Sequence, residues 1–164
     1  MSFRNVRLDL VARHTGWEYR ELRQALQQGL VPACDWLPGP KWYLEPVVVD
    51  EITAMLLVAG LVLRSFGITD AAVRQMLSAM TMPRRWHQQP ERTPLLSAVL
   101  DHDRVVVQLA EQAYLRFQID RETTDWMCFR QGSVFSAQEF SPRAVLAVDL
   151  GGIHQQLLSG DLAS

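Results

Sequence analysis

The chain has 164 residues, a formal net charge of −2, 48% hydrophobic residues and 21% charged residues. This is ordinary globular usage, with room for one domain or two small ones, and the low charge argues against a protein that coats nucleic acid regardless of sequence. Residues 1–90 hold ten Lys or Arg and eight Asp or Glu, a balance of +2, whereas residues 91–164 hold six and ten, a balance of −4. A mildly basic first half and an acidic second half favour a local contact with nucleic acid.

Two cysteines, Cys34 and Cys128, stand far apart, with no second Cys or His at ligand spacing. The pattern predicts neither a disulfide framework nor a zinc site, and we expect no metal and no cofactor. The first residues lack the pattern of a signal peptide, which is an apolar stretch behind basic residues. The apolar run at 52–63 is too short to cross a bilayer. We therefore expect a cytoplasmic protein with no membrane partner.

Residues 6–31 predict two short amphipathic helices joined by a tight turn. Apolar residues recur there at three-and-four spacing, at Leu8, Val11 and Ala12 and again at Leu22, Ala25 and Leu26. Thr15-Gly16 is predicted to end the first helix, because Gly readily takes the left-handed conformation that turns the chain. The second helix is predicted to end at Gly29, with Pro32 just beyond. This order is that of a helix-turn-helix.

The second helix has a polar outer face, made of Glu18, Tyr19, Arg20, Arg23, Gln24 and Gln27. Arg and Gln are residue types that reach phosphates and base edges in the major groove, Arg at guanine and Gln at adenine. The alternative is a solvated helix face, which charged and amide residues make in any soluble protein. Helix-turn-helix geometry alone leaves both interpretations open.

The segment DWLPGPKWYLEP at residues 35–46 predicts a hairpin, because Pro38-Gly39-Pro40 forces a turn. Three residues follow that turn: Lys41, Trp42 and Tyr43. In one interpretation they contact a DNA backbone, as a wing does. In the other, the aromatic residues only pack the hairpin against the helices. Two further helices are predicted at residues 51–65, capped by Asp50 and ended by Gly67, and at residues 70–80, capped by Thr69.

The order helix, turn, helix, hairpin, helix resembles the DNA-binding domain of the mercury-resistance regulator (MerR) family and its winged-helix relatives. LVARHTGWEYRELRQALQQGLV is similar to the family's opening motif at Ala12, Thr15, Gly16, Arg20, Leu22, Arg23, Gly29 and Leu30. Lys41-Trp42-Tyr43 stands where the family's wing carries an Arg-Tyr pair. LRSFGITDAAVRQML is similar to the family's "Lr.lGfsl.eI..lL" motif at Leu63, Arg64, Gly67, Ile68, Val73 and Leu77.

The resemblance implies a winged helix-turn-helix over residues 1–82 that binds double-stranded DNA. The DNA-binding residues predicted in this way are Arg13, His14, Tyr19, Arg20, Arg23, Gln27, Lys41, Trp42 and Tyr43. The chain departs from the family at Gln24 and Ala25, where the family has paired tyrosines, which puts a MerR-like distortion of promoter DNA in doubt. The polar, proline-rich residues 83–94 predict a linker in place of the family's coiled coil.

Residues 95–164 predict a small mixed α/β unit. Apolar and β-branched runs predict a sheet of about four short strands, drawn from residues 105–109, 114–119, 126–129, 133–135 and 144–148, and a final helix at 153–158. His102, Asp149 and His154 lack the converging partners that a metal or catalytic site needs, and Gly151-Gly152 lacks the surroundings of a phosphate loop. We therefore expect no enzyme, and a unit that dimerises the protein or binds a partner protein.

The sequence predicts an α+β protein, an N-terminal winged helix-turn-helix followed by a mixed α/β unit, acting as a sequence-specific DNA-binding transcriptional regulator and a homodimer. One version is an antitoxin that represses its own operon through the first half and neutralises a toxin with the second. The alternative is a protein-interaction module that keeps a winged-helix shape without binding DNA. A third interpretation is a small-molecule sensor with its ligand among four aromatic residues, although such residues more often belong to a core: Trp126, Phe129, Phe135 and Phe140.

Overall fold

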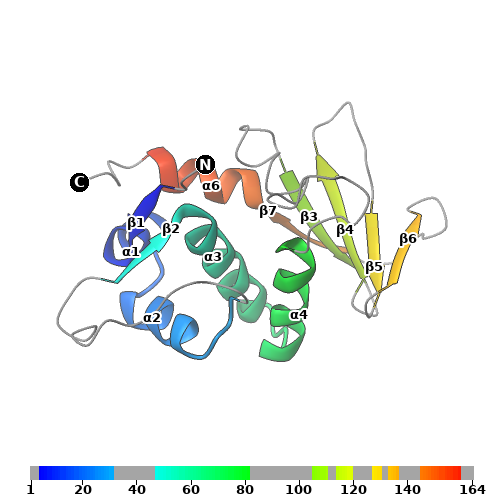
Figure 1. Cartoon of the computed structure of the whole chain (residues 1–164), viewed down its shortest axis with the longest axis horizontal. Helices are drawn as coiled ribbons and strands as arrows, with labels where there is room; N and C mark the ends of the chain where they lie inside the picture. Colours follow the sequence, from blue (N-terminus) through cyan, green and yellow to red (C-terminus); the bar gives the residue numbers. More distant parts are fainter. Residues whose placement is uncertain are drawn as a thin grey trace. The chain divides into compact units, whose positions relative to one another are not determined.

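The computed structural model describes residues 4–31, 47–81, 105–110, 114–119, 127–130, 133–136 and 145–159. Within them the protein is α+β, with helices, a two-stranded antiparallel sheet and a five-stranded antiparallel sheet (Figure 1), which confirms the predicted class. The chain divides into two compact units, the first made of Met1–Ser78 and Ile153–Ser164 and the second of Ala79–Gly152. The predicted hairpin at residues 35–46 and the predicted linker at residues 83–94 lie outside the described residues.

The first unit contains the two helices expected near the start of the chain, α1 at Leu8–Thr15 and α2 at Tyr19–Gln27. Gly16 ends α1 with a left-handed φ of 77°, and its N–H donates a 3.0 Å hydrogen bond to the carbonyl of Ala12. Gly29 follows α2 with a φ of 66°. Since residues with a side chain are strained at such angles, both glycines end their helices as predicted.

The first unit also contains a short sheet that the sequence did not predict. Strand β1, Asn5–Arg7, pairs antiparallel with β2, Val48–Asp50, so that Val6 lies opposite Val49. The predicted helix beginning at residue 6 is therefore wrong in its start, because Val6 is a strand residue and α1 begins at Leu8. Val6 and Val49 are both buried. Three residues are too few to establish a period-two pattern, and the pairing partner lies far along the chain.

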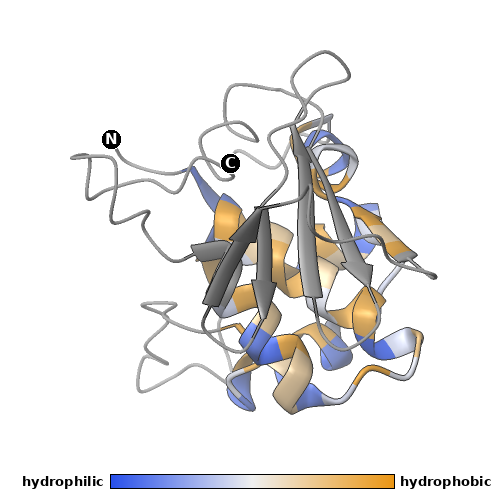
Figure 2. Cartoon of the chain, turned by 90° about the vertical axis from the view of Figure 1, so that its right-hand side faces the viewer, coloured by the Kyte–Doolittle hydropathy of each residue, from blue (hydrophilic) through white to orange (hydrophobic). Residues whose placement is uncertain are grey.

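Helix α3, Glu51–Ser65, has the predicted bounds and lies at the centre of the first unit (Figure 1). The Asp50 carboxylate caps it, accepting hydrogen bonds of 2.7 Å from both the N–H and the hydroxyl of Thr53. Eleven of the fifteen residues of α3 are buried. Figure 2 shows apolar and polar residues alternating along the helical ribbons. No helix in the described ranges combines the length and apolar character needed to cross a bilayer.

Helix α4, Asp70–Thr81, follows a left-handed Gly67, whose φ is 81°. The Thr69 hydroxyl accepts the N–H of Ala72 at 3.4 Å, as expected for the predicted cap. An ion pair of 2.9 Å joins Arg64 at the end of α3 to Asp70 at the start of α4. These contacts fix the corner between the two helices.

The core of the first unit has one position where only a glycine fits easily. A Cβ atom on Gly60 of α3 would lie 3.0 Å from Cδ2 of Leu30 and 3.2 Å from Cδ1 of Leu77. Both leucines are buried, so the missing side chain lets the segment after α2 and helix α4 pack closely on α3. The segment that follows α2 therefore rests on a tightly packed helix.

The second unit is a five-stranded sheet, rather than the predicted sheet of about four strands. Its strands are β3 at Val105–Ala110, β4 at Tyr114–Ile119, β5 at Met127–Arg130, β6 at Ser133–Ser136 and β7 at Val145–Asp149. The order is β6-β5-β4-β3-β7, and every neighbouring pair is antiparallel. Strands β3 to β6 form a meander, and β7 returns to pair with β3.

The last helix, α6 at Leu150–Ser159, begins earlier than predicted and directly follows β7. Gly151 and Gly152 lie in its first turn, where the Asp149 carboxylate accepts the N–H of Gly152 at 2.9 Å. A Cβ atom on Gly152 would approach that carboxylate to 2.9 Å, so the glycine makes room for the cap. We predicted the helix within the second unit, but from Ile153 onward it belongs to the first.

Candidate nucleic-acid interface

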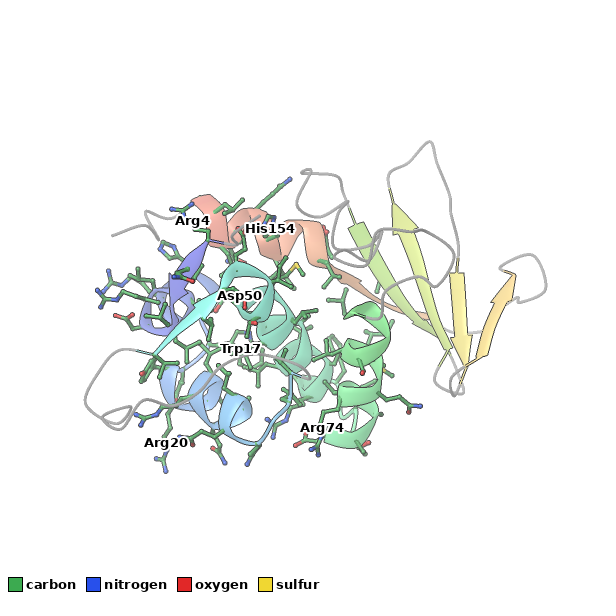
Figure 3. All side chains as sticks on the ribbon, in the orientation of Figure 1. Arg4, Trp17, Arg20, Asp50, Arg74 and His154 are labelled. Carbon is green, nitrogen blue, oxygen red and sulfur yellow. The ribbon has the colours of Figure 1, made fainter. Side chains whose placement is uncertain are left out.

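Helix α2 presents one polar face to solvent and one apolar face to the core. Leu22, Ala25 and Leu26 are buried, and Leu22 and Ala25 have no exposed surface. The exposed residues of α2 and its ends are Glu18, Arg20, Glu21, Gln24, Gln27 and Gln28. Arg20 lies at the outer edge of α2 (Figure 3), whereas Trp17, just before the helix, is half-buried. The packing thus fixes which polar side chains an approaching molecule would meet.

Gln24 lies at the middle of this exposed face. At 100° per residue, Arg20 and Gln28 lie one turn before and after Gln24, and Gln27 lies beside it. Tyr19 is half-buried on the flank of the helix. The sequence alone singled out Tyr19 and treated Gln24 mainly as a departure from the family motif, whereas burial makes Gln24 the more accessible residue. The exposed face of α2 hereafter means Arg20, Glu21, Gln24, Gln27 and Gln28.

Arg23 is also less exposed than the residues of this face. Its side chain is of intermediate burial, and it takes part in an interaction within the chain. Arg23 therefore lies at the border of the exposed face, one helical position from the buried Leu22.

Arg13 and His14 lie in the last turn of α1, next to the turn that leads into α2. Arg13 is exposed and His14 is half-exposed. Basic residues at a helix C-terminus interact favourably with the helix dipole, which gives both residues a structural role as well as a possible phosphate contact. The Thr15 hydroxyl, by contrast, bonds back to the carbonyl of Val11 at 2.7 Å.

Charges of both signs lie on and beside the exposed face of α2. Glu18 and Glu21 are exposed beside Arg20. The Arg7 guanidinium bonds to the Asp9 carboxylate at 2.7 Å and 3.1 Å, which holds the pKa of Asp9 below its ordinary value. Arg7 is therefore already paired with an anion. Any DNA contact here would rest on a few cations and several amides, with little excess of positive charge.

The three wing residues predicted from the resemblance, Lys41, Trp42 and Tyr43, lie outside the described residues. Within the ranges that are described, no group of three or more His, Cys, Asp or Glu side chains is arranged to hold a metal ion.

Polar groups from α6, α3 and the residue before β1 form a cluster that the sequence did not predict. The Nε2 atom of His154 lies 3.5 Å from Oε2 of Glu51, and the His154 side chain is only 2% exposed. The other carboxylate oxygen of Glu51 accepts the N–H of Arg4 at 3.4 Å. The sequence has no Glu or Asp at metal-site spacing from His154 along its own helix. The partner comes from the start of α3, far away in the sequence.

Comparison of the chain with protein-family models, with curated proteins and with solved structures found no match. The resemblance to the MerR family therefore rests on the motif residues alone and stays a prediction. The structural features that bear on function are the exposed face of α2 and the contacts that hold this helix in place.

Proposed function

We propose that the protein is a sequence-specific DNA-binding transcriptional regulator in which α2 is the recognition helix. The observation that carries this proposal is the exposed face of α2, where one arginine, one glutamate and three glutamines are held outward by the burial of Leu22, Ala25 and Leu26. The turn at Gly16 places this helix directly after α1, as in helix-turn-helix proteins.

The chemistry of these side chains suits base edges. The major groove of B-DNA, about 12 Å wide, accepts one α-helix. Arg20 would donate two hydrogen bonds to O6 and N7 of guanine, and Gln24 or Gln27 would pair with N6 and N7 of adenine. Glu21 would accept a hydrogen bond from N4 of cytosine. Neutral amide side chains form hydrogen bonds with base edges but do not attract phosphates by charge. A surface rich in amides is therefore consistent with the chain's small net charge.

Other predicted contacts would position the helix on the backbone. Arg13 and His14, at the end of α1, would contact phosphates beside the groove, and the resemblance assigns the same role to Lys41, Trp42 and Tyr43. With so few cations, one copy of the chain would bind weakly. A homodimer on two half-sites, with the second unit as the dimerisation or partner-binding part, would supply the missing affinity.

The second candidate is a protein-interaction module that keeps the helix-turn-helix without binding DNA. The observation in its favour is the pair of exposed carboxylates, Glu18 and Glu21, that flank Arg20. Carboxylates repel phosphates, so this end of α2 would suit a basic protein surface as well as a groove.

Selection from a pool of random-sequence DNA duplexes separates the two candidates. We expect the full chain to enrich a short motif containing guanine and adenine at fixed spacing, repeated as two half-sites if the protein is a dimer. If repeated rounds enrich no motif, while the chain remains folded by circular dichroism, the DNA-binding proposal is overturned in favour of the interaction module.

A further inference from the structure

We propose that Gln156 of α6 is a positioning residue for the recognition helix, because it holds the end of α1 at the point where the chain turns toward α2. This inference rests on the proposed function and extends it to a residue at the far end of the sequence. The carrying contact is a hydrogen bond of 2.7 Å from the Nε2 amide of Gln156 to the main-chain carbonyl of His14.

That carbonyl is one of the groups that a helix cannot satisfy by itself. The last four C=O groups of an α-helix have no partner within the helix. In α1 the Gly16 N–H satisfies the carbonyl of Ala12, and Gln156 satisfies that of His14. His14 lies two residues before the left-handed Gly16. The contact therefore acts beside the hinge of the helix-turn-helix.

Helix α6 is anchored independently of this contact, so Gln156 has a fixed base from which to act. Leu157 has no exposed surface, and His154 lies against Glu51 at 3.5 Å. Glu51 is the first residue of α3 and bonds to the N–H of Arg4. Gln156 thus connects α1 to a helix that is itself held on α3 and on the residue preceding β1.

The contact bears on DNA binding because base readout tolerates little displacement. Side chains must meet base edges at hydrogen-bond distance and angle, whereas phosphate contacts accept more variation. Releasing the end of α1 would loosen the turn and let α2 tilt, which moves Arg20 and Gln24 together. The expected loss is that of one neutral hydrogen bond, about two- to tenfold in affinity for a specific site.

The test compares Gln156→Ala with Gln155→Ala in the full chain. Gln155 is the same residue type, exposed on the same helix one position earlier, and serves as the matched control. Two further variants refine the comparison. Gln156→Lys keeps an N–H donor on a flexible side chain, and Gln156→Glu keeps the shape but has no donor for a carbonyl.

Two measurements are made on each variant. The first, without DNA, is amide hydrogen exchange at Gly16 and Trp17 together with the thermal unfolding midpoint. The second is affinity for the duplex enriched by selection and for an unrelated duplex of the same length. A residue that only stabilised the fold would lower the unfolding midpoint and would change both affinities by the same factor, which is the fraction of folded protein.

We expect Gln156→Ala and Gln156→Glu to speed exchange at Gly16 and to weaken specific binding by about two- to tenfold, with binding to the unrelated duplex nearly unchanged. Gln156→Lys should recover part of the loss, and Gln155→Ala should match the unaltered chain. If the unaltered chain binds the selected duplex and Gln156→Ala behaves like Gln155→Ala, this inference fails and the proposed function stands. If the unaltered chain binds no duplex specifically, the proposed function fails and the role of Gln156 in it fails as well.

Discussion

The imidazole Nε2 of His154 lies 3.5 Å from Oε2 of Glu51, with side-chain exposures of 2% and 12% for the two residues. Removing a buried polar group's partner usually costs more than forming the contact gains, because the remaining group has lost its water. The cluster therefore couples the docking of α6 to the start of α3. It also joins the two ends of the chain, since Arg4 donates to the same carboxylate.

Glu51→Ala should lower the free energy of unfolding of the full chain by about 1–3 kcal/mol, because the N–H of Arg4 loses its acceptor and the buried His154 imidazole loses the carboxylate beside it. Glu51→Gln is the matched control: it removes the same favourable charge from the first turn of α3 but keeps an acceptor oxygen. Urea unfolding measures both. Equal midpoints for the Ala and Gln variants would contradict the proposed role of the carboxylate.

Asp50→Ala should cost about 0.5–2 kcal/mol, because the N–H and hydroxyl of Thr53 both lose the oxygen to which they donate at 2.7 Å. Asp50→Ser keeps a capping oxygen and should restore most of that free energy. The measurement is the urea midpoint of each variant, with an unchanged slope. An Ala variant as stable as the Ser variant would show that the cap contributes little.

The pair of Arg7 and Asp9 predicts a small dependence of stability on pH. The hydrogen bond from Arg7 lowers the pKa of Asp9 below its ordinary value of 3.8, so the folded state favours the ionised carboxylate. The resulting stabilisation is present above the unfolded-state pKa and is lost as pH falls through the lowered value of the folded state. Because the two side chains are 40% and 38% exposed, solvent screens most of it.

The check is the difference in free energy of unfolding between the unaltered chain and Asp9→Asn as the solution is acidified. That difference should be small at neutral pH and should vanish once Asp9 is protonated. A difference that grows on acidification would mean that the pair does not favour the ionised carboxylate.

Local sequence patterns correctly predicted the positions of several helices and strands. The bounds of α3 agree with the prediction because Asp50 and Gly67 mark its ends through local backbone chemistry. The strand at residues 114–119 agrees because its period-two alternation spans six residues. The face of α2 was also readable, since three-and-four spacing separates Leu22 and Leu26 from the exposed residues.

Contacts between distant segments were not readable. Strands β1 and β2 each have three residues and acquire strand geometry from each other. The partners of His154 and Gln156 are Glu51 and the carbonyl of His14, which no spacing rule connects to the final helix. One local signal was also missed: the helix was predicted to begin at Ile153 because Gly151 and Gly152 are poor helix formers, whereas Asp149 caps a helix that begins at Leu150. The prediction for residues 1–82 accordingly omitted the helix that completes the first unit.

Lys41→Ala tests the predicted wing separately from the proposed recognition helix. If Lys41 contacts a phosphate, the variant should weaken binding to every duplex alike and reduce the slope of log affinity against log salt by about one. Titrations over a range of salt concentrations measure that slope. A loss confined to the selected duplex, with the slope unchanged, would instead assign Lys41 to base readout.

The most direct test of the account is the affinity of Arg20→Ala for the selected duplex, measured by fluorescence anisotropy. Arg74→Ala is the matched control, since Arg74 is an exposed arginine on another helix, α4. If Arg20 makes a bidentate contact with guanine, its removal should cost about 1–3 kcal/mol on the selected duplex, far less on a duplex with that guanine replaced, and nothing in Arg74→Ala. Isotherms for Arg20→Ala that coincide with those of the unaltered chain, with folding intact, would contradict α2 as the helix that reads DNA.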